Sequence, residues 1–162
     1  MPIRPTKEHA KPRRLKDFSY RGYHRYFITI RSHKFERHFV PYEVVAKVIE
    51  LLKSTADQKG FSVWAYCFMP DHAHLLVEGK HDNADMKHFV ASFKQKSGYW
   101  FRTNYGVKLW APNYHEHVLR NDEATMAVAR YIIQNPVRKG MVDDCSNYPY
   151  SGSFELEDIC SL

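Results

Sequence analysis

Apolar and polar residues alternate in four short segments of the chain and recur at helical spacing in three longer ones. In the segment 26–31, one face of a strand would carry Tyr26, Ile28 and Ile30. A helix is predicted over 41–59, because its apolar residues form one stripe and Gly60 follows it. The same patterns predict the remaining elements: strands over 61–69, 72–78 and 111–119, and helices over 83–101 and 121–135.

The predicted order is strand, helix, strand, strand, helix, strand, helix. This order is typical of an α+β fold, a ferredoxin-like (RRM-like) antiparallel sheet with helices on one face and an added C-terminal helix. We divide the chain into a basic, flexible N-terminal tail (1–19), one domain (20–152) and a C-terminal tail (153–162).

Two histidines stand two residues apart inside the strand predicted over 72–78. Side chains two apart on a strand share a face, so His72 and His74 would lie together while Leu75 and Val77 point to the other face. A pair of imidazole nitrogens is half of a metal site. The plain alternative is a chance pair, since the chain has ten histidines.

The last predicted helix carries a tyrosine on its polar side. It begins near Asn121, as a capping residue, and ends before Pro136. Gln134 and Asn135 follow Tyr131 at helical spacing, and the carboxamide oxygen of either could complete a metal site with the histidines. The alternative is that Tyr131 is an ordinary core tyrosine.

Composition favours a nucleic-acid partner. The chain of 162 residues has a net charge of +6 and a pI near 9.2, which favours a polyanion. Its apolar runs are too short to cross a bilayer, so we expect no membrane partner. Three cysteines without metal-ligand spacing suggest structural thiols and a cytoplasmic, nucleoid-associated protein, with a Cys145–Cys160 pair left open.

Positive charge gathers in the N-terminal tail, on the second predicted helix and next to the tyrosine helix. A lysine or arginine in these places would contact DNA phosphates, although a solvated basic face is the simpler interpretation of the second helix. The residues expected to bind DNA are Arg13, Arg14, Lys94, Lys96, Arg120 and Arg130.

Three segments in this order resemble the single-tyrosine HUH transposases, and within them the REP-associated tyrosine transposase group. They are Cys67 to Val77 with its His-Ala-His core, Leu109 to Arg120, and Tyr131 to Val137. The resemblance runs from about residue 20 to residue 152. It implies the same antiparallel-sheet core and a transposase acting on DNA.

The chemistry expected from this resemblance is cleavage and strand transfer on single-stranded DNA that contains a short hairpin. Tyr131 is the nucleophile, His72 and His74 are metal ligands, and Asn135 is the third ligand, where the broader insertion-sequence transposases have glutamine. The resemblance implies a 5′-phosphotyrosine intermediate with a free 3′-hydroxyl. A divalent cation, Mg²⁺ or Mn²⁺, would neutralise the phosphodiester.

Two other functions remain open, and so does the oligomeric state. The same sheet topology occurs in non-catalytic modules that bind single-stranded nucleic acid. A metal-dependent phosphodiesterase would use water and leave Tyr131 structural. A different tyrosine, Tyr114, competes as the nucleophile if it is exposed. The wider family includes dimers, so either a monomer or a homodimer is expected.

Overall fold

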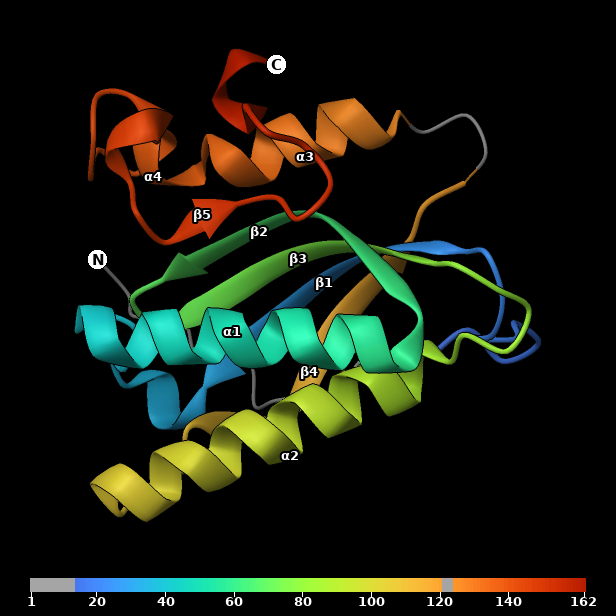
Figure 1. Cartoon of the computed structure of the whole chain (residues 1–162), viewed down its shortest axis with the longest axis horizontal. Helices are drawn as coiled ribbons and strands as arrows, with labels where there is room; N and C mark the ends of the chain where they lie inside the picture. Colours follow the sequence, from blue (N-terminus) through green and yellow to red (C-terminus); the bar gives the residue numbers. More distant parts are fainter. Residues whose placement is uncertain (1–13, 121–123) are drawn as a thin grey trace, which may run out of the picture.

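A five-stranded antiparallel sheet forms the centre of the fold (Figure 1). The structure is a computed structural model that describes residues 14–120 and 124–162. The strands are β1 (Arg25–Ser32), β2 (Phe61–Met69), β3 (His72–Gly79), β4 (Trp110–Val118) and β5 (Ser151–Gly152). They lie in the order β4-β1-β3-β2-β5, and β2 and β3 form a hairpin across residues 70 and 71.

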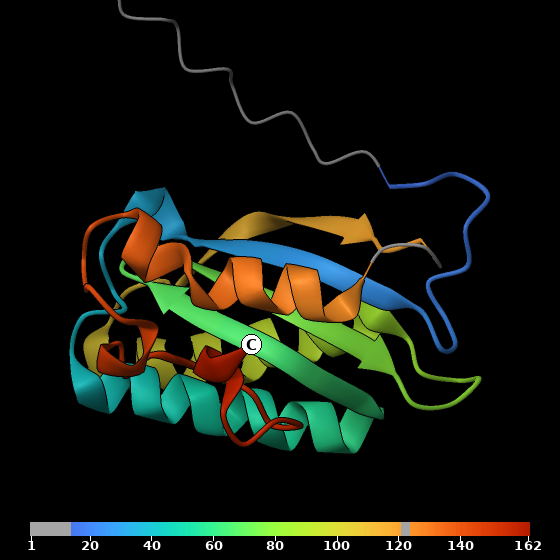
Figure 2. The same cartoon turned by 90° about the horizontal axis from the view of Figure 1, so that it is seen from above.

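The helices cover the two faces of this sheet unequally (Figures 1 and 2). Two long helices, α1 (Tyr42–Lys59) and α2 (Met86–Tyr105), pack on one face. On the other face, α3 (Thr125–Ile133) packs over β2 and β3, followed by the short α4 (Asn135–Arg138). The predicted ferredoxin-like fold with an added tyrosine-bearing helix is therefore confirmed. The edge strand β5 was not predicted, because two residues are too few to show alternation.

The period of two along the strands divides the core in two. On β1, Tyr26, Ile28 and Ile30 are fully buried against α1 and α2. The opposite face of β2 and β3 packs against Ile132 and Ile133 of α3. Central strands buried on both faces have nearly continuous apolar sequences, which is the pattern of β2.

Several helix ends differ from the prediction or lie outside the described residues. The helix predicted over 121–135 ends at Ile133, and the short α4 then runs through Pro136 instead of stopping before it. The helix α2 begins three residues later than predicted, because the Asp85 side chain caps it by accepting from the backbone N–H of His88. It ends four residues later, at Tyr105, and is followed by Gly106, whose φ of 75° suits glycine. The cap predicted at Asn121 lies outside the described residues, and α3 begins at Thr125.

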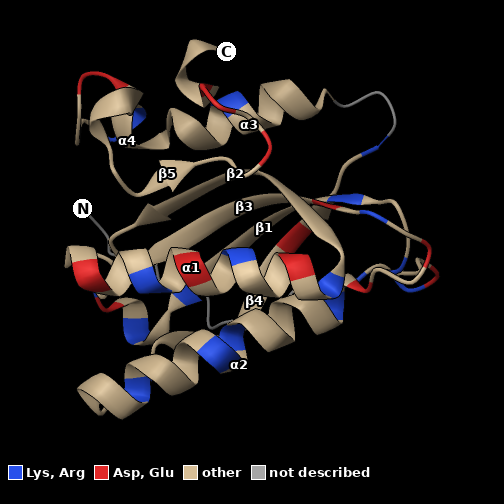
Figure 3. Cartoon of the chain, in the orientation of Figure 1, with Lys and Arg blue, Asp and Glu red and all other residues tan. Residues whose placement is uncertain are grey.

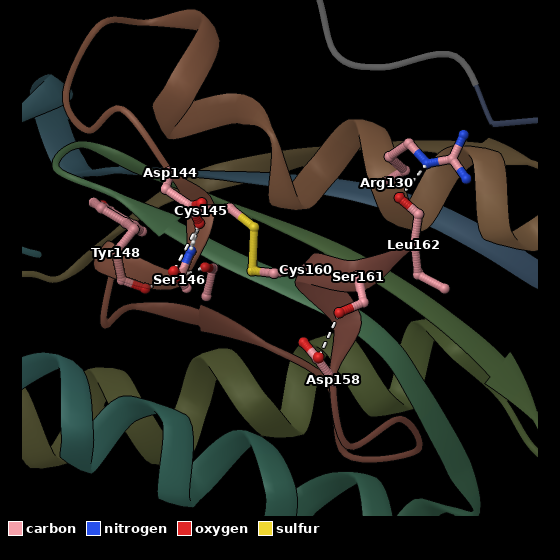
Figure 4. The surroundings of a disulfide bond; sticks show 10 residues. Arg130, Asp144, Cys145, Ser146, Tyr148, Asp158, Cys160, Ser161 and Leu162 are labelled. Atoms are coloured by element: carbon pink, nitrogen blue, oxygen red, sulfur yellow. Dashed lines mark hydrogen bonds between the residues drawn. A yellow bond between two sulfur atoms is a disulfide. The ribbon is translucent and has the colours of Figure 1, made fainter.

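Both expected tails contribute to the packed domain where the structure describes them. In the first, Phe18 packs against the core. In the second, Ile159 is buried, and Cys160 forms a disulfide with Cys145, with Cα atoms 6.0 Å apart (Figure 4). The structure thus selects the pairing that the sequence left open. The third cysteine, Cys67, is a buried thiol whose pKa is raised to about 12 by burial.

None of the helices in residues 14–120 and 124–162 is both long and apolar enough to cross a membrane.

Candidate active site

The two histidines lie side by side on the face of the sheet that carries α3. β3 pairs with β1 so that His74 is opposite Thr29 and His72 is opposite Arg31. The intervening Ala73 and the following Leu75 are buried in the core on the other face. Strand alternation alone therefore brings the two imidazoles together, as the sequence predicted.

Each imidazole is held so that its Nε2 atom points to the other. The Nδ1 atom of His72 is 2.6 Å from the Oδ1 atom of Asp71, and the Nδ1 atom of His74 is 3.0 Å from the Oγ1 atom of Thr29. The two Nε2 atoms are 3.1 Å apart. A partner on Nδ1 fixes the tautomer and orientation of a metal-ligating histidine, so Asp71 and Thr29 are suited to that role.

The separation of the two Nε2 atoms fits one divalent cation. Two ligands at about 2.1 Å from an ion and at right angles to each other are about 3.0 Å apart. A tetrahedral ion at that bond length would need about 3.4 Å. The observed 3.1 Å would let both atoms bind one ion, and it is also an ordinary hydrogen-bond distance between the two nitrogens.

Burial keeps His74 in the form that binds metals. Its pKa is lowered to about 4, first by burial and then by the charges of nearby groups that include Arg138 and Lys139. A neutral imidazole has a lone pair available for coordination. Both histidines line a pocket of about 280 Å³ together with Thr29, Arg31, Phe35 and Asp71.

Tyr131 lies on the same side of the sheet as the histidines. Its side chain is 54% exposed, and its ring meets Phe27 edge-on with centroids 6.2 Å apart. The ring of Phe27 also lies 5.5 Å from that of His74, so one side chain contacts both groups. The Arg138 guanidinium stacks on the Tyr131 ring, with its Cζ atom 3.9 Å from the ring centroid. The Nη2 atom of Arg138 also donates to the Tyr131 backbone carbonyl at 2.7 Å.

Asn135 and Tyr131 stand at helical spacing in the sequence, but their surroundings differ. Asn135 is the first residue of α4 and only 6% exposed, whereas Tyr131, one turn earlier, is exposed. Its Oδ1 accepts from the Nη2 atom of Arg138 at 3.4 Å, a long contact that leaves room for another partner. It does not line the pocket around the histidines. The third ligand therefore stays a prediction.

Among the described residues there is no group of three or more His, Cys, Asp or Glu side chains that could hold a metal. The fit to a cation rests on the two imidazoles, with carboxamide or water oxygens for the other positions.

Most of the basic residues expected to bind DNA have other contacts or lie elsewhere. Arg14 forms an ion pair with Glu116 and stacks on the Tyr114 ring, and Arg130 donates to the Leu162 carbonyl at 2.9 Å (Figure 4). Lys94 and Lys96 belong to α2, which lies on the opposite face of the sheet from α3 (Figure 3).

Lys94 in particular is a structural residue. Its Nζ atom donates to the carbonyls of Ala111 at 2.8 Å and Pro112 at 3.2 Å. Burial lowers its pKa to about 8. Lys96 bonds to Gln58. Arg120 is exposed at the end of β4, and Arg13 lies outside the described residues.

The competing tyrosine, Tyr114, lies on the other side of the sheet from the histidines. The expectation that it is exposed is wrong, because it is half-buried against the α1 and α2 core, with its hydroxyl 3.9 Å from the sulfur of Met86. Alternation along β4 turns Tyr114 away from the face that carries the histidines.

Sequence reasoning missed four residues that orient the site. Thr29 and Phe27 stand on the face of β1 that the pattern assigned away from the core. Asp71 directly precedes the first histidine, and Arg138 lies seven residues, about two helical turns, after Tyr131. The sequence shows where these residues stand along the chain. It does not show what their side chains contact, because that depends on the register between β1 and β3.

A family model for IS200-like transposases matches residues 21–135. The chain belongs to this family. The match ends at Asn135, so it covers the histidine strand and the tyrosine helix together.

Two related sequences agree with this assignment, and one solved structure has a similar fold. The chain is 29% identical over 110 residues to a Haemophilus influenzae protein assigned to the REP-associated tyrosine transposases, covering 61% of this chain and 62% of that protein, less than two thirds of its length. It is 24% identical over 125 residues to the Escherichia coli K12 REP-associated tyrosine transposase, covering 76% of this chain and 72% of that one. The fold is similar, with a TM-score of 0.68 and 20% identity, to a REP-associated tyrosine transposase solved bound to a REP hairpin, over 86% of this chain and 81% of that chain.

Proposed function

We propose that this IS200-like transposase cleaves single-stranded DNA with a divalent metal and transfers the strand through a covalent 5′-phosphotyrosine on Tyr131. The observation that carries the proposal is the position of Phe27, whose ring contacts both Tyr131 and His74. A phosphate beside the imidazoles would then be within reach of the phenol.

The reaction is a displacement at phosphorus. The phenolic oxygen of Tyr131 forms a bond to the phosphorus while the bond from phosphorus to the 3′ oxygen breaks. The phenol loses its proton and the departing oxygen gains one, so the products are a 5′-phosphotyrosine and a free 3′-hydroxyl. The phosphodiester is conserved in the new ester, and a 3′-hydroxyl can therefore reverse the attack without a nucleotide cofactor.

The residues around the phosphate have separate tasks. His72 and His74 would hold Mg²⁺ or Mn²⁺, with Asn135 as the third protein ligand. When bound, the cation neutralises a non-bridging oxygen and orients the scissile bond. Arg138 holds the tyrosine ring by stacking on it and bonding to its carbonyl.

The substrate we propose is single-stranded DNA next to a hairpin. One solved neighbour is described as bound to a REP hairpin, and two relatives are named REP-associated. The exposure of Tyr131 is compatible with access by an unpaired strand.

A pair of end-labelled substrates tests this function directly. The protein is incubated with Mn²⁺ and a hairpin-containing oligonucleotide pool labelled at either the 5′ or the 3′ end, and the products are separated on a denaturing gel. A 5′-phosphotyrosine retains the 3′ label on the protein, giving a shifted band that protease removes. The 5′ label appears on a shorter strand that terminal transferase can extend.

The alternatives give different gels. A phosphodiesterase that uses water shortens both labelled strands without a shifted band. A non-catalytic binding module changes neither label. An adduct that retains the 5′ label would overturn the proposed polarity.

A further inference from the structure

A second pocket opens beside the histidine pocket, at the end of β1 and the start of β4. It has a volume of about 240 Å³, and its lining includes Arg31, Phe35, Pro112, Asn113 and His115. The two pockets share Thr29, Arg31 and Phe35, so they are adjacent. Sites for drug-sized ligands are commonly about 300–1,000 Å³, so this pocket suits a single flat group such as a nucleobase.

The loop that ends this pocket holds an aromatic ring in an unusual backbone conformation. Lys34 and Phe35 have φ values of 53° and 57°, a region that residues other than glycine seldom adopt. The turn is kept in place because Ser32 Oγ donates to the Glu36 carbonyl at 2.6 Å and the His33 amide donates to the Leu109 carbonyl at 2.9 Å. Strained residues fixed by their surroundings are concentrated at functional sites.

This conformation presents Phe35 and Arg31 together. The Phe35 ring is 46% exposed, and the Arg31 guanidinium lies 5.2 Å from its centroid. The pocket lining contains Arg31, Lys34 and two histidines but no acidic residue. An exposed ring next to a cation is the usual combination for stacking a base and binding its phosphate.

The order of residues along β1 places this pocket relative to the nucleophile. Phe27 meets Tyr131 edge-on, Thr29 is opposite His74, Arg31 is opposite His72, and the Phe35 loop follows. From Phe27 to Arg31 a strand extends about 13 Å. The histidines therefore lie between Tyr131 and the Phe35 pocket.

We infer that the pocket binds the nucleotide on the 5′ side of the scissile phosphate, with its base stacked on Phe35 and its phosphate contacting Arg31. This assignment rests on the proposed function. In a displacement at phosphorus the attacking and departing oxygens are roughly in line, on opposite sides of the phosphorus. With Tyr131 attacking from one side, the departing 3′ oxygen and its nucleotide lie on the side of Phe35.

The test combines side-chain changes with removal of single bases. The wild-type gel first identifies the scissile phosphate, and substrates are then made with an abasic residue on its 5′ or its 3′ side. Phe35→Leu keeps an apolar side chain and removes the ring, and Phe35→Trp keeps a ring. The half-saturating DNA concentration and the maximal rate of adduct formation are measured for each combination, and melting curves check folding.

Loss of stacking should raise the half-saturating concentration by about tenfold, with little change in the maximal rate. We expect this loss for Phe35→Leu and for the 5′ abasic substrate, no further loss when the two are combined, and recovery in Phe35→Trp. Coupling of Phe35 to the 3′ abasic position would overturn the in-line placement. An effect of Phe35→Leu that is independent of both abasic positions would overturn base binding. If the wild-type protein forms no adduct with any substrate, the proposed function itself fails and this assignment fails with it.

Discussion

Removing the hydroxyl of Tyr131 should abolish covalent chemistry and leave the fold almost unchanged. The side chain is 54% exposed, and its packing contacts with Phe27 and Arg138 involve the ring, which Tyr131→Phe keeps. Surface substitutions of this kind change the free energy of unfolding by less than about 0.5 kcal/mol. For a domain of this size that is less than about 2 °C in Tm.

A buried tyrosine provides the contrast. The hydroxyl of Tyr148 is buried and donates to the Phe68 carbonyl, so Tyr148→Phe removes a satisfied bond in the core. We expect a loss of about 1–3 kcal/mol in the free energy of unfolding. The corresponding fall in Tm is about 2–12 °C. Differential scanning fluorimetry of the two variants separates an exposed hydroxyl from a structural one.

Activity should fall most in Tyr131→Phe, the variant whose stability changes least. Tyr131→Phe should reduce adduct formation by about 10³-fold or more, because the oxygen that we propose as the nucleophile is removed. Tyr99→Phe is the matched control, since Tyr99 is 74% exposed but lies on α2, on the other face of the sheet. Single-stranded DNA binding, measured by fluorescence anisotropy, should persist in both variants and weaken with added salt.

Two results would refute this reasoning. If Tyr131→Phe still forms the protease-sensitive adduct, another group is the nucleophile, and Tyr99→Phe and Tyr114→Phe identify or exclude two tyrosines. If Tyr131→Phe loses the adduct but its Tm also falls by several degrees, the hydroxyl has a structural partner and the loss of activity says little about chemistry.

Three further predictions concern the metal, a buried lysine and the disulfide. His74→Ala should abolish Mn²⁺-dependent cleavage and also Mn²⁺ binding measured by calorimetry. His88→Ala, on the opposite face, should keep both the cleavage and the binding. Cleavage by His74→Ala at matched Mn²⁺ would exclude the metal assignment. Lys94 has a pKa of about 8 in the folded protein against 10.5 for the free side chain, so the unfolded state binds more protons between these pH values. The stability of the wild type relative to Lys94→Met, measured by urea titration, should therefore rise by about 3 kcal/mol from pH 8 to 10.5. A flat difference would contradict this burial. Replacing Cys145 and Cys160 with serine should lower Tm by about 6–12 °C, since closing a loop of 15 residues contributes about 3 kcal/mol, and an equal Tm with and without reductant would contradict the cross-link.

Local patterns were enough to predict the strands but not the ends of every helix. The strand β2 begins and ends where the sequence predicted, because Gly60 and Pro70 bound a nearly continuous apolar run. The ends of α2 depend on the Asp85 cap and on Gly106, which the apolar stripe does not mark.

Sequence patterns did not show which charged and aromatic side chains are already held by partners in the fold. The count of lysines and arginines favoured a polyanion, but Lys94 and Arg14 are both held by partners on β4. The motif around Tyr114 suggested exposure, yet alternation along β4 turns its ring into the core. Which face a side chain occupies is decided by strand register and helix packing, and these depend on residues far away in the chain.

The site itself follows from incomplete coverage of one face of the sheet. The helix α3 packs mainly on β2 and β3. Residues of β1 and β3 line the histidine pocket, and residues of β1 and β4 line the second pocket. His74 is buried enough to stay neutral at physiological pH, while Tyr131 remains exposed. A neutral ligand and an accessible nucleophile have opposite requirements for burial. Phe27 contacts the rings of both His74 and Tyr131, so these two side chains lie next to each other. A phosphate at the edge of α3 could reach both of them together.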